Sequence, residues 1–139
     1  MAHKIREVYI VHHSHTDVGY TDLQEQVIYN QANNIRRAVE LIADGLEKGT
    51  NQKGLKWNCE TWYCVEQFLK VATKEEKKTF FDLVKKNSIG LSANYLNFND
   101  LADCEDLTEK IHDMQEVCAE EGVTVKTAMF ADINGISMG

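Results

Sequence analysis

Short runs of strand-forming residues alternate with longer stretches in which apolar residues recur at helical spacing. The strand-like runs cover residues 6–13, 54–60, 88–98 and 123–132. The helical patterns cover residues 22–49, 61–72, 74–87 and 103–122. The first helix is expected to stop at Gly45 or Gly49, and the two middle patterns form either one helix or two. The predicted order of elements is therefore βαβαβαβ.

This alternation predicts an α/β fold, in which a parallel sheet is covered by helices and the connections are right-handed crossovers. The first run has consecutive apolar residues at positions 8–11. A run without alternation is typical of a parallel strand buried on both faces. Folds of this type bind their ligands at the carboxyl ends of the strands, so candidate functional residues are expected there.

Histidine and acidic residues gather at these predicted strand ends. His13, His15 and Asp17 follow the first run, and alternate side chains of an extended segment point to one side. Imidazole and carboxylate groups spaced in this way can reach a single divalent ion, and both are zinc ligands. Glu60 ends the second run, and Asp132 ends the fourth after mostly apolar residues.

Each of these residues also has a simpler structural explanation. The histidines and Asp17 fit a polar loop in which an acid caps the next helix. Glu60 fits an acidic residue in the first turn of a helix, and Asp132 fits the N-cap of a following helix. The residue pattern alone leaves both explanations open.

Composition and charge narrow the function classes. The chain has 139 residues and a net charge of -7, which fits one domain and, without a basic stripe, argues against a nucleic-acid partner. No apolar run is long enough for a membrane span and no signal peptide is recognisable, so no membrane partner and a cytoplasmic location are expected. The cysteines fit no CxxC pattern and are expected to be reduced, structural thiols.

Two motifs resemble those of a known enzyme family. Residues 13–20, HSHTDVGY, are similar to the HxHxDxGW motif of family 38 of the glycoside hydrolases, the class II α-mannosidases. Residues 130–137, FADINGIS, resemble the D-P-F-G-x-S segment of that family. The resemblance covers nearly the whole chain and implies the amino-terminal part of a seven-stranded α/β barrel. Residues 92–100, SANYLNFND, are only loosely similar and have no predicted role.

The resemblance implies a role for each motif residue. His15 and Asp17 would be zinc ligands, and Asp132 would be both the third ligand and the catalytic nucleophile. One Zn²⁺ is implied, although other divalent ions have compatible chemistry. Tyr20 replaces the family's tryptophan and would stack under the sugar ring of an α-mannoside. His13 and Glu60 also lie at the ends of predicted strand-like runs. They are candidates for residues that hold the metal ligands in place without binding the metal themselves.

The expected reaction is incomplete within this chain. Retaining glycoside hydrolysis needs a nucleophilic carboxylate and a second carboxyl group about 5 Å away that acts as acid and then as base. In the family, this acid/base residue and a further histidine ligand come from later segments, and neither His3 nor His112 is a natural fourth ligand. Residues 1–139 are therefore expected to be a fragment of a longer glycosidase that is inactive alone and self-associates through an uncovered barrel edge.

Other classes of function remain open. An HxH pattern near the first strand also occurs in metal-dependent amidohydrolases and PHP-type phosphoesterases, in which a metal-activated hydroxide attacks the substrate. The chain could instead be a non-catalytic module that binds a metal or a sugar. The simplest alternative is an α/β domain whose polar strand ends only face water.

Overall fold

Four helices and one two-stranded sheet make up the part of the chain that the computed structural model describes, residues 4–50, 54–97 and 103–133. The elements follow in the order α1 (Gln24–Lys48), β1 (Trp57–Asn58), α2 (Trp62–Val71), α3 (Lys74–Lys85), β2 (Ile89–Gly90) and α4 (Cys104–Glu120). Strands β1 and β2 are parallel, with Trp57 opposite Ile89 and Asn58 opposite Gly90.

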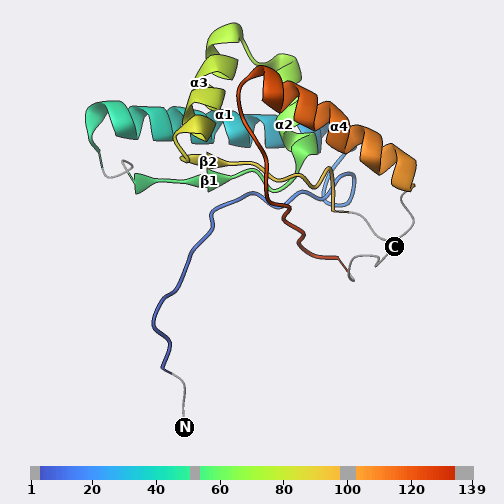
Figure 1. The fold of residues 1–139 in the computed structure, drawn as a ribbon, viewed down its shortest axis with the longest axis horizontal. Coiled ribbons are helices and arrows are strands. Elements are labelled where there is room, and N and C mark those ends of the chain that lie inside the picture. Colours follow the sequence, from blue (N-terminus) through green and yellow to red (C-terminus); the bar gives the residue numbers. More distant parts are fainter. Residues whose placement is uncertain (1–3, 51–53, 98–102, 134–139) are drawn as a thin grey trace.

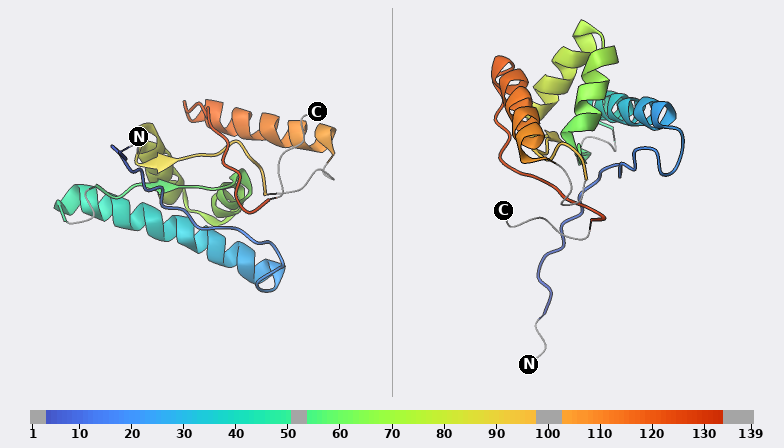
Figure 2. Two further views of the ribbon diagram at one scale, coloured as in Figure 1. Left: turned by 90° about the horizontal axis from the view of Figure 1, so that it is seen from below. Right: turned by 90° about the vertical axis from the view of Figure 1, so that its right-hand side faces the viewer.

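The helices are gathered on one side of the sheet. Figure 1 shows all four of them above strands β1 and β2, while the first segment of the chain projects away below. Seen from below, the strands lie between α1 and α4, with α2 and α3 behind them (Figure 2). The hydrophobic core therefore fills the space between the sheet and the helices.

Helix α1 follows from its apolar stripe. Ile35, Val39 and Ile42 recur at helical spacing and are buried against the core. The helix continues through Gly45, which is buried, and ends before Gly49, whose φ of 63° is left-handed and suits a residue without a side chain. Gly45 and Gly49 were the possible ends of this helix predicted from the sequence, and the helix ends at Gly49. None of the described helices is both long and apolar enough to cross a membrane.

The middle of the chain forms two helices. Helix α3 begins with a capping box, in which the Thr73 side chain accepts from the Glu76 N–H and the Glu76 side chain accepts from the Thr73 N–H. Phe68 of α2 packs against Phe80 of α3, with ring centroids 5.3 Å apart. Both rings are fully buried, so the two helices share the centre of the core.

The expectation of a partial seven-stranded α/β barrel with four parallel strands is wrong. Within the described residues the sheet has only β1 and β2, each two residues long, and most of the regular structure is helical. These strands lie inside the second and third predicted runs, and they are parallel. The first and fourth runs are extended but form no strand.

The first run fails as a strand because its backbone has too few partners. Its side chains are exposed, with Val8 at 77% and Ile10 at 78%, although the unbroken apolar sequence predicted burial on both faces. The run meets the sheet near its end, where the Asn58 N–H donates to His12 O at 2.8 Å. A strand needs repeated backbone pairing along a neighbour, and apolar composition does not provide that neighbour.

The fourth run lies beside β2 but is held mainly by side chains. The Ala93 N–H donates to Thr127 O at 2.8 Å. Further along, the Met129 N–H donates to the Ser92 hydroxyl at 2.8 Å instead of to a backbone carbonyl. Because a side chain takes the place of the next backbone partner, the segment follows the sheet without a regular ladder.

Candidate metal centre

Three of the predicted ligands lie together although they are distant in sequence. One ligand atom each from His15, Asp17 and Asp132 lies within 4.8 Å of the others. His15 Nε2 is 3.4 Å from Asp17 Oδ1 and 3.7 Å from Asp132 Oδ2. These separations exceed the ~2.8 Å of a charge-assisted hydrogen bond. They are close to the ~3.3 Å between neighbouring ligands of a tetrahedral ion with bonds of about 2.0 Å.

The alternation of the extended chain positions His15 and Asp17. Thr16, which lies between them, is only 4% exposed and turns into the core. Its N–H donates to Glu60 Oε2 at 2.9 Å, and its hydroxyl lies 3.1 Å from Cys64 Sγ. Since the middle residue points inward, the side chains on either side of it point outward to the same space.

Glu60 supports the cluster from the core side. Its side chain is fully buried, and Oε1 lies 2.8 Å from His15 Nδ1. This hydrogen bond raises the pKa of His15 and leaves its Nε2 facing the two aspartates. His13 Nδ1 lies 3.6 Å from the same Glu60 oxygen and is buried, with no hydrogen-bond partner among the described residues. Glu60 thus contacts a predicted ligand directly, and His13 lies next to Glu60.

Asp132 reaches the cluster from the end of the fourth run. Its φ of 53° is left-handed, a conformation that aspartate tolerates better than most residues. The Ala131 N–H donates to Asn97 Oδ1 at 3.3 Å, and Asn94 Nδ2 donates to Met129 O at 3.1 Å. The Asp132 side chain itself is 84% exposed, so it is open to a ligand from solvent.

Several residues that hold the cluster in place were not identified from the sequence. Ser92, Asn94 and Asn97 anchor the fourth run, yet their segment had no predicted role. On α1, Gln31 Nε2 donates to His15 O at 2.8 Å, and Asn34 Nδ2 donates to the Ser14 hydroxyl at 3.0 Å. The only hint in the sequence is that Ser92 and Asn94 are polar positions within the strand-like run 88–98, which does not by itself indicate an anchoring role.

Among the described residues, the ligand cluster includes neither Tyr20, the predicted stacking residue, nor His112, which was not expected to bind the metal. Tyr20 is 92% exposed in the turn before α1, so its stacking role stays a prediction. His112 is exposed on α4. His3 and residues 134–137 of the second motif lie outside the described residues.

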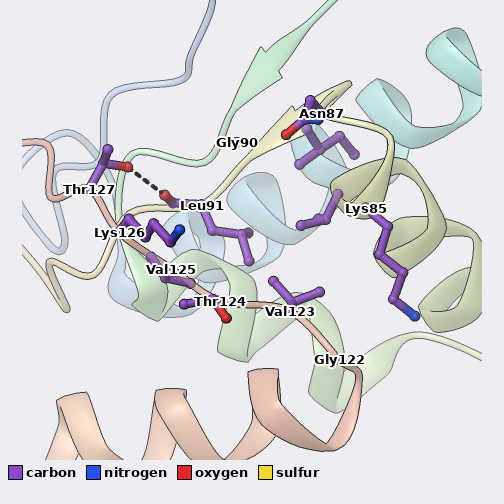
Figure 3. A pocket seen from close by; sticks show the side chains of 12 residues that line it. Lys85, Asn87, Gly90, Leu91, Gly122, Val123, Thr124, Val125, Lys126 and Thr127 are labelled. Atoms are coloured by element: carbon purple, nitrogen blue, oxygen red, sulfur yellow. Dashed lines mark hydrogen bonds between the residues drawn. The ribbon is translucent and has the colours of Figure 1, made fainter.

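A separate hollow lies on the other side of β2 from β1. It has a volume of about 550 Å³ and lies between β2, the end of α3 and residues 122–127 (Figure 3). The Thr127 hydroxyl donates to Leu91 O at 3.2 Å across one end of it. Lys85 and Lys126 are its charged side chains, and it contains none of the predicted ligands. The candidate metal centre is therefore not part of this hollow.

The donor set fits a divalent metal ion. An imidazole nitrogen and two carboxylate oxygens are suitable ligands for zinc, and three protein ligands leave a coordination position for water or substrate. A histidine whose other nitrogen binds a carboxylate is the usual arrangement around such ions. Comparison with known proteins adds no family, since no family model, curated protein or solved structure matches the chain.

Proposed function

We propose that this chain contributes the metal centre and the nucleophile of a zinc-dependent retaining glycoside hydrolase that acts on α-mannoside-like substrates. The observation that carries the proposal is the convergence of His15, Asp17 and Asp132 on one point. The motif resemblance names these same residues as zinc ligands. Two distant motifs thus supply one compatible donor set. The observed fold does not support the proposal. The resemblance implied a seven-stranded barrel, whereas the described residues form only a two-stranded sheet.

In this proposal each residue of the cluster has a defined task. His15 Nε2 and the carboxylates of Asp17 and Asp132 would hold the ion, which when bound supplies positive charge that orients sugar hydroxyls and stabilises the charged transition state. An Asp132 oxygen attacks the anomeric carbon as the bond to the leaving group breaks, and the exposure of this side chain leaves room for the sugar. The acid/base carboxyl group that protonates the leaving oxygen is not assigned.

Metal binding by the chain is the first test. We expect Zn²⁺ to bind with a stoichiometry near one, measured by competition with a chromophoric chelator after metal removal. His15→Ala and Asp132→Asn should each weaken binding at least about tenfold, because each removes one of three ligands. His112→Ala is the matched control, since His112 is exposed on α4 and is not a member of the cluster. Equal zinc affinity in all four proteins would contradict the metal centre.

Catalysis is tested on the natural protein, recovered from its source with antibodies raised against this chain. We expect it to hydrolyse an aryl α-mannoside with retention of anomeric configuration, followed by NMR of the first-formed sugar. Preferential hydrolysis of an aryl phosphate would instead identify a metal-dependent phosphoesterase. Zinc binding without turnover of either substrate would favour a non-catalytic binding module.

A further inference from the structure

We propose that Glu60 is a positioning residue that fixes the tautomer of His15 and thereby directs Nε2 to the metal. The inference rests on the proposed metal centre, but it concerns a residue that does not itself bind the ion. Glu60 acts through His15 and through the backbone next to it.

Both oxygens of the Glu60 carboxylate are used. Oε1 lies 2.8 Å from His15 Nδ1, and Oε2 accepts the Thr16 N–H at 2.9 Å. An ionised carboxylate can only accept hydrogen bonds, so Nδ1 of His15 carries the proton. In the neutral ring, Nε2 then has a free lone pair, and it is this atom that faces Asp17 and Asp132.

The surroundings of Glu60 distinguish this role from that of a helix-terminal acid. Glu60 immediately precedes Thr61, the N-cap of α2, whose side chain makes no capping hydrogen bond. An acid that served this helix terminus would accept from the N–H groups of its first turn. The Glu60 oxygens instead accept from Thr16 and His15, which lie on the ligand-bearing segment.

Burial also indicates a role in the site. The Glu60 side chain is fully buried, and an ionised carboxylate is costly to bury without a compensating charge. Within the described part of the chain its ion-pair partners are only His13 and His15, with no lysine or arginine among them. A cation bound at His15 Nε2 would supply the missing positive charge through the imidazole ring.

The backbone on either side of Glu60 is fixed. The Cys59 N–H donates to Gly90 O at 2.9 Å, and the Trp62 N–H donates to Asn94 O at 2.8 Å. The carboxylate therefore extends from a rigid junction between β1 and α2. A rigid support of this kind holds a ligand in the geometry needed for binding.

Glu60→Gln tests the inference because the amide has one acceptor and one donor. The Thr16 N–H still requires the oxygen, so the amide NH₂ faces His15 Nδ1 and favours the tautomer protonated at Nε2. We expect zinc affinity to fall about 10- to 100-fold, the usual effect of losing such a support. Glu66→Gln is the matched control, since Glu66 contacts Lys70 and Tyr95 instead of the ligands.

A second measurement does not depend on metal, and its result on the unaltered chain does not depend on the folding of a variant. Long-range ¹H–¹⁵N correlation spectra of the metal-free chain, at a pH where the imidazole is neutral, report which nitrogen of His15 carries the proton. We expect Nδ1–H in the unaltered chain and in Glu66→Gln, and Nε2–H in Glu60→Gln.

The outcomes separate the two proposals. If the unaltered chain shows His15 protonated at Nε2, or if Glu60→Gln keeps both the tautomer and the zinc affinity, the role of Glu60 is wrong while the metal centre can stand. If zinc does not bind but the tautomer is Nδ1–H and switches in Glu60→Gln, the metal centre fails and the positioning of His15 by Glu60 stands.

Discussion

Ser92 connects β2 to the segment that carries Asp132, and its removal should weaken both the fold and the metal centre. The Ser92 hydroxyl accepts the Met129 N–H at 2.8 Å and the Asn94 N–H at 3.3 Å, and Ser92 is only 2% exposed. Ser92→Ala removes one oxygen and leaves almost no cavity. The effect should therefore come from the two N–H groups that lose their acceptor.

The structure sets the size of this effect. A buried donor left without a partner costs about 1–3 kcal/mol. The Asn94 hydrogen bond is long, and Met129 is only partly buried, so water can replace part of the loss. We expect the free energy of unfolding to fall by about 1–2 kcal/mol. Asn94 still donates to Met129 O, so the segment stays near β2, and zinc affinity should fall about tenfold, equivalent to about 1.4 kcal/mol.

Urea unfolding and zinc competition titrations measure these two quantities. Ser88→Ala is the control, because Ser88 precedes β2 and its side chain makes no hydrogen bond within the described part of the chain. We expect that control to change stability by less than about 0.5 kcal/mol and to bind zinc normally. A loss of stability in Ser92→Ala with unchanged zinc affinity would refute the idea that Ser92 positions Asp132.

Three further predictions concern the rest of the molecule. The hydrogen bond from the Thr73 N–H lowers the pKa of Glu76. The Glu76 carboxylate therefore stabilises the fold at pH values above its usual pKa, and this stabilisation is lost as the pH falls through the lowered pKa. A fall in pH should then reduce the free energy of unfolding less in Glu76→Gln than in the unaltered chain. Iodoacetamide should modify exposed Cys104 first, and Cys118, whose pKa burial raises to about 11, only on unfolding, as followed by mass spectrometry. Phe68→Ala should cost about 3–5 kcal/mol in urea unfolding, because the ring is fully buried.

Helices were more predictable from the sequence than strands. The stripe of Ile35, Val39 and Ile42 defines the buried face of α1 by itself, because helical hydrogen bonds form within one segment. The amino acids of residues 6–13 favour a strand just as clearly. A strand, however, depends on backbone partners elsewhere in the chain. Consecutive apolar residues therefore indicated extended backbone, and did not indicate whether Val8 or Ile10 would be covered.

The candidate ligands and one supporting residue, Glu60, could be named from the sequence, whereas the residues that anchor the segment of Asp132 could not. His15, Asp17 and Asp132 stood out because their side chains have metal-binding chemistry and similar spacing to a known motif. Ser92 and Asn94 have no distinctive chemistry. Their importance comes from the backbone groups of Met129 that they meet, and only the three-dimensional arrangement brings these groups together.

The two sides of the candidate centre are supported to different degrees. His15 is fixed by buried Glu60, whereas Asp132 is 84% exposed and adopts a left-handed backbone conformation at a segment end held by side-chain hydrogen bonds. A left-handed non-glycine residue costs on the order of 1 kcal/mol and persists only where its surroundings favour it. A bound ion would add a direct bond to the Asp132 carboxylate. Metal binding should therefore order the Asp132 side far more than the His15 side, which the protein already holds in place.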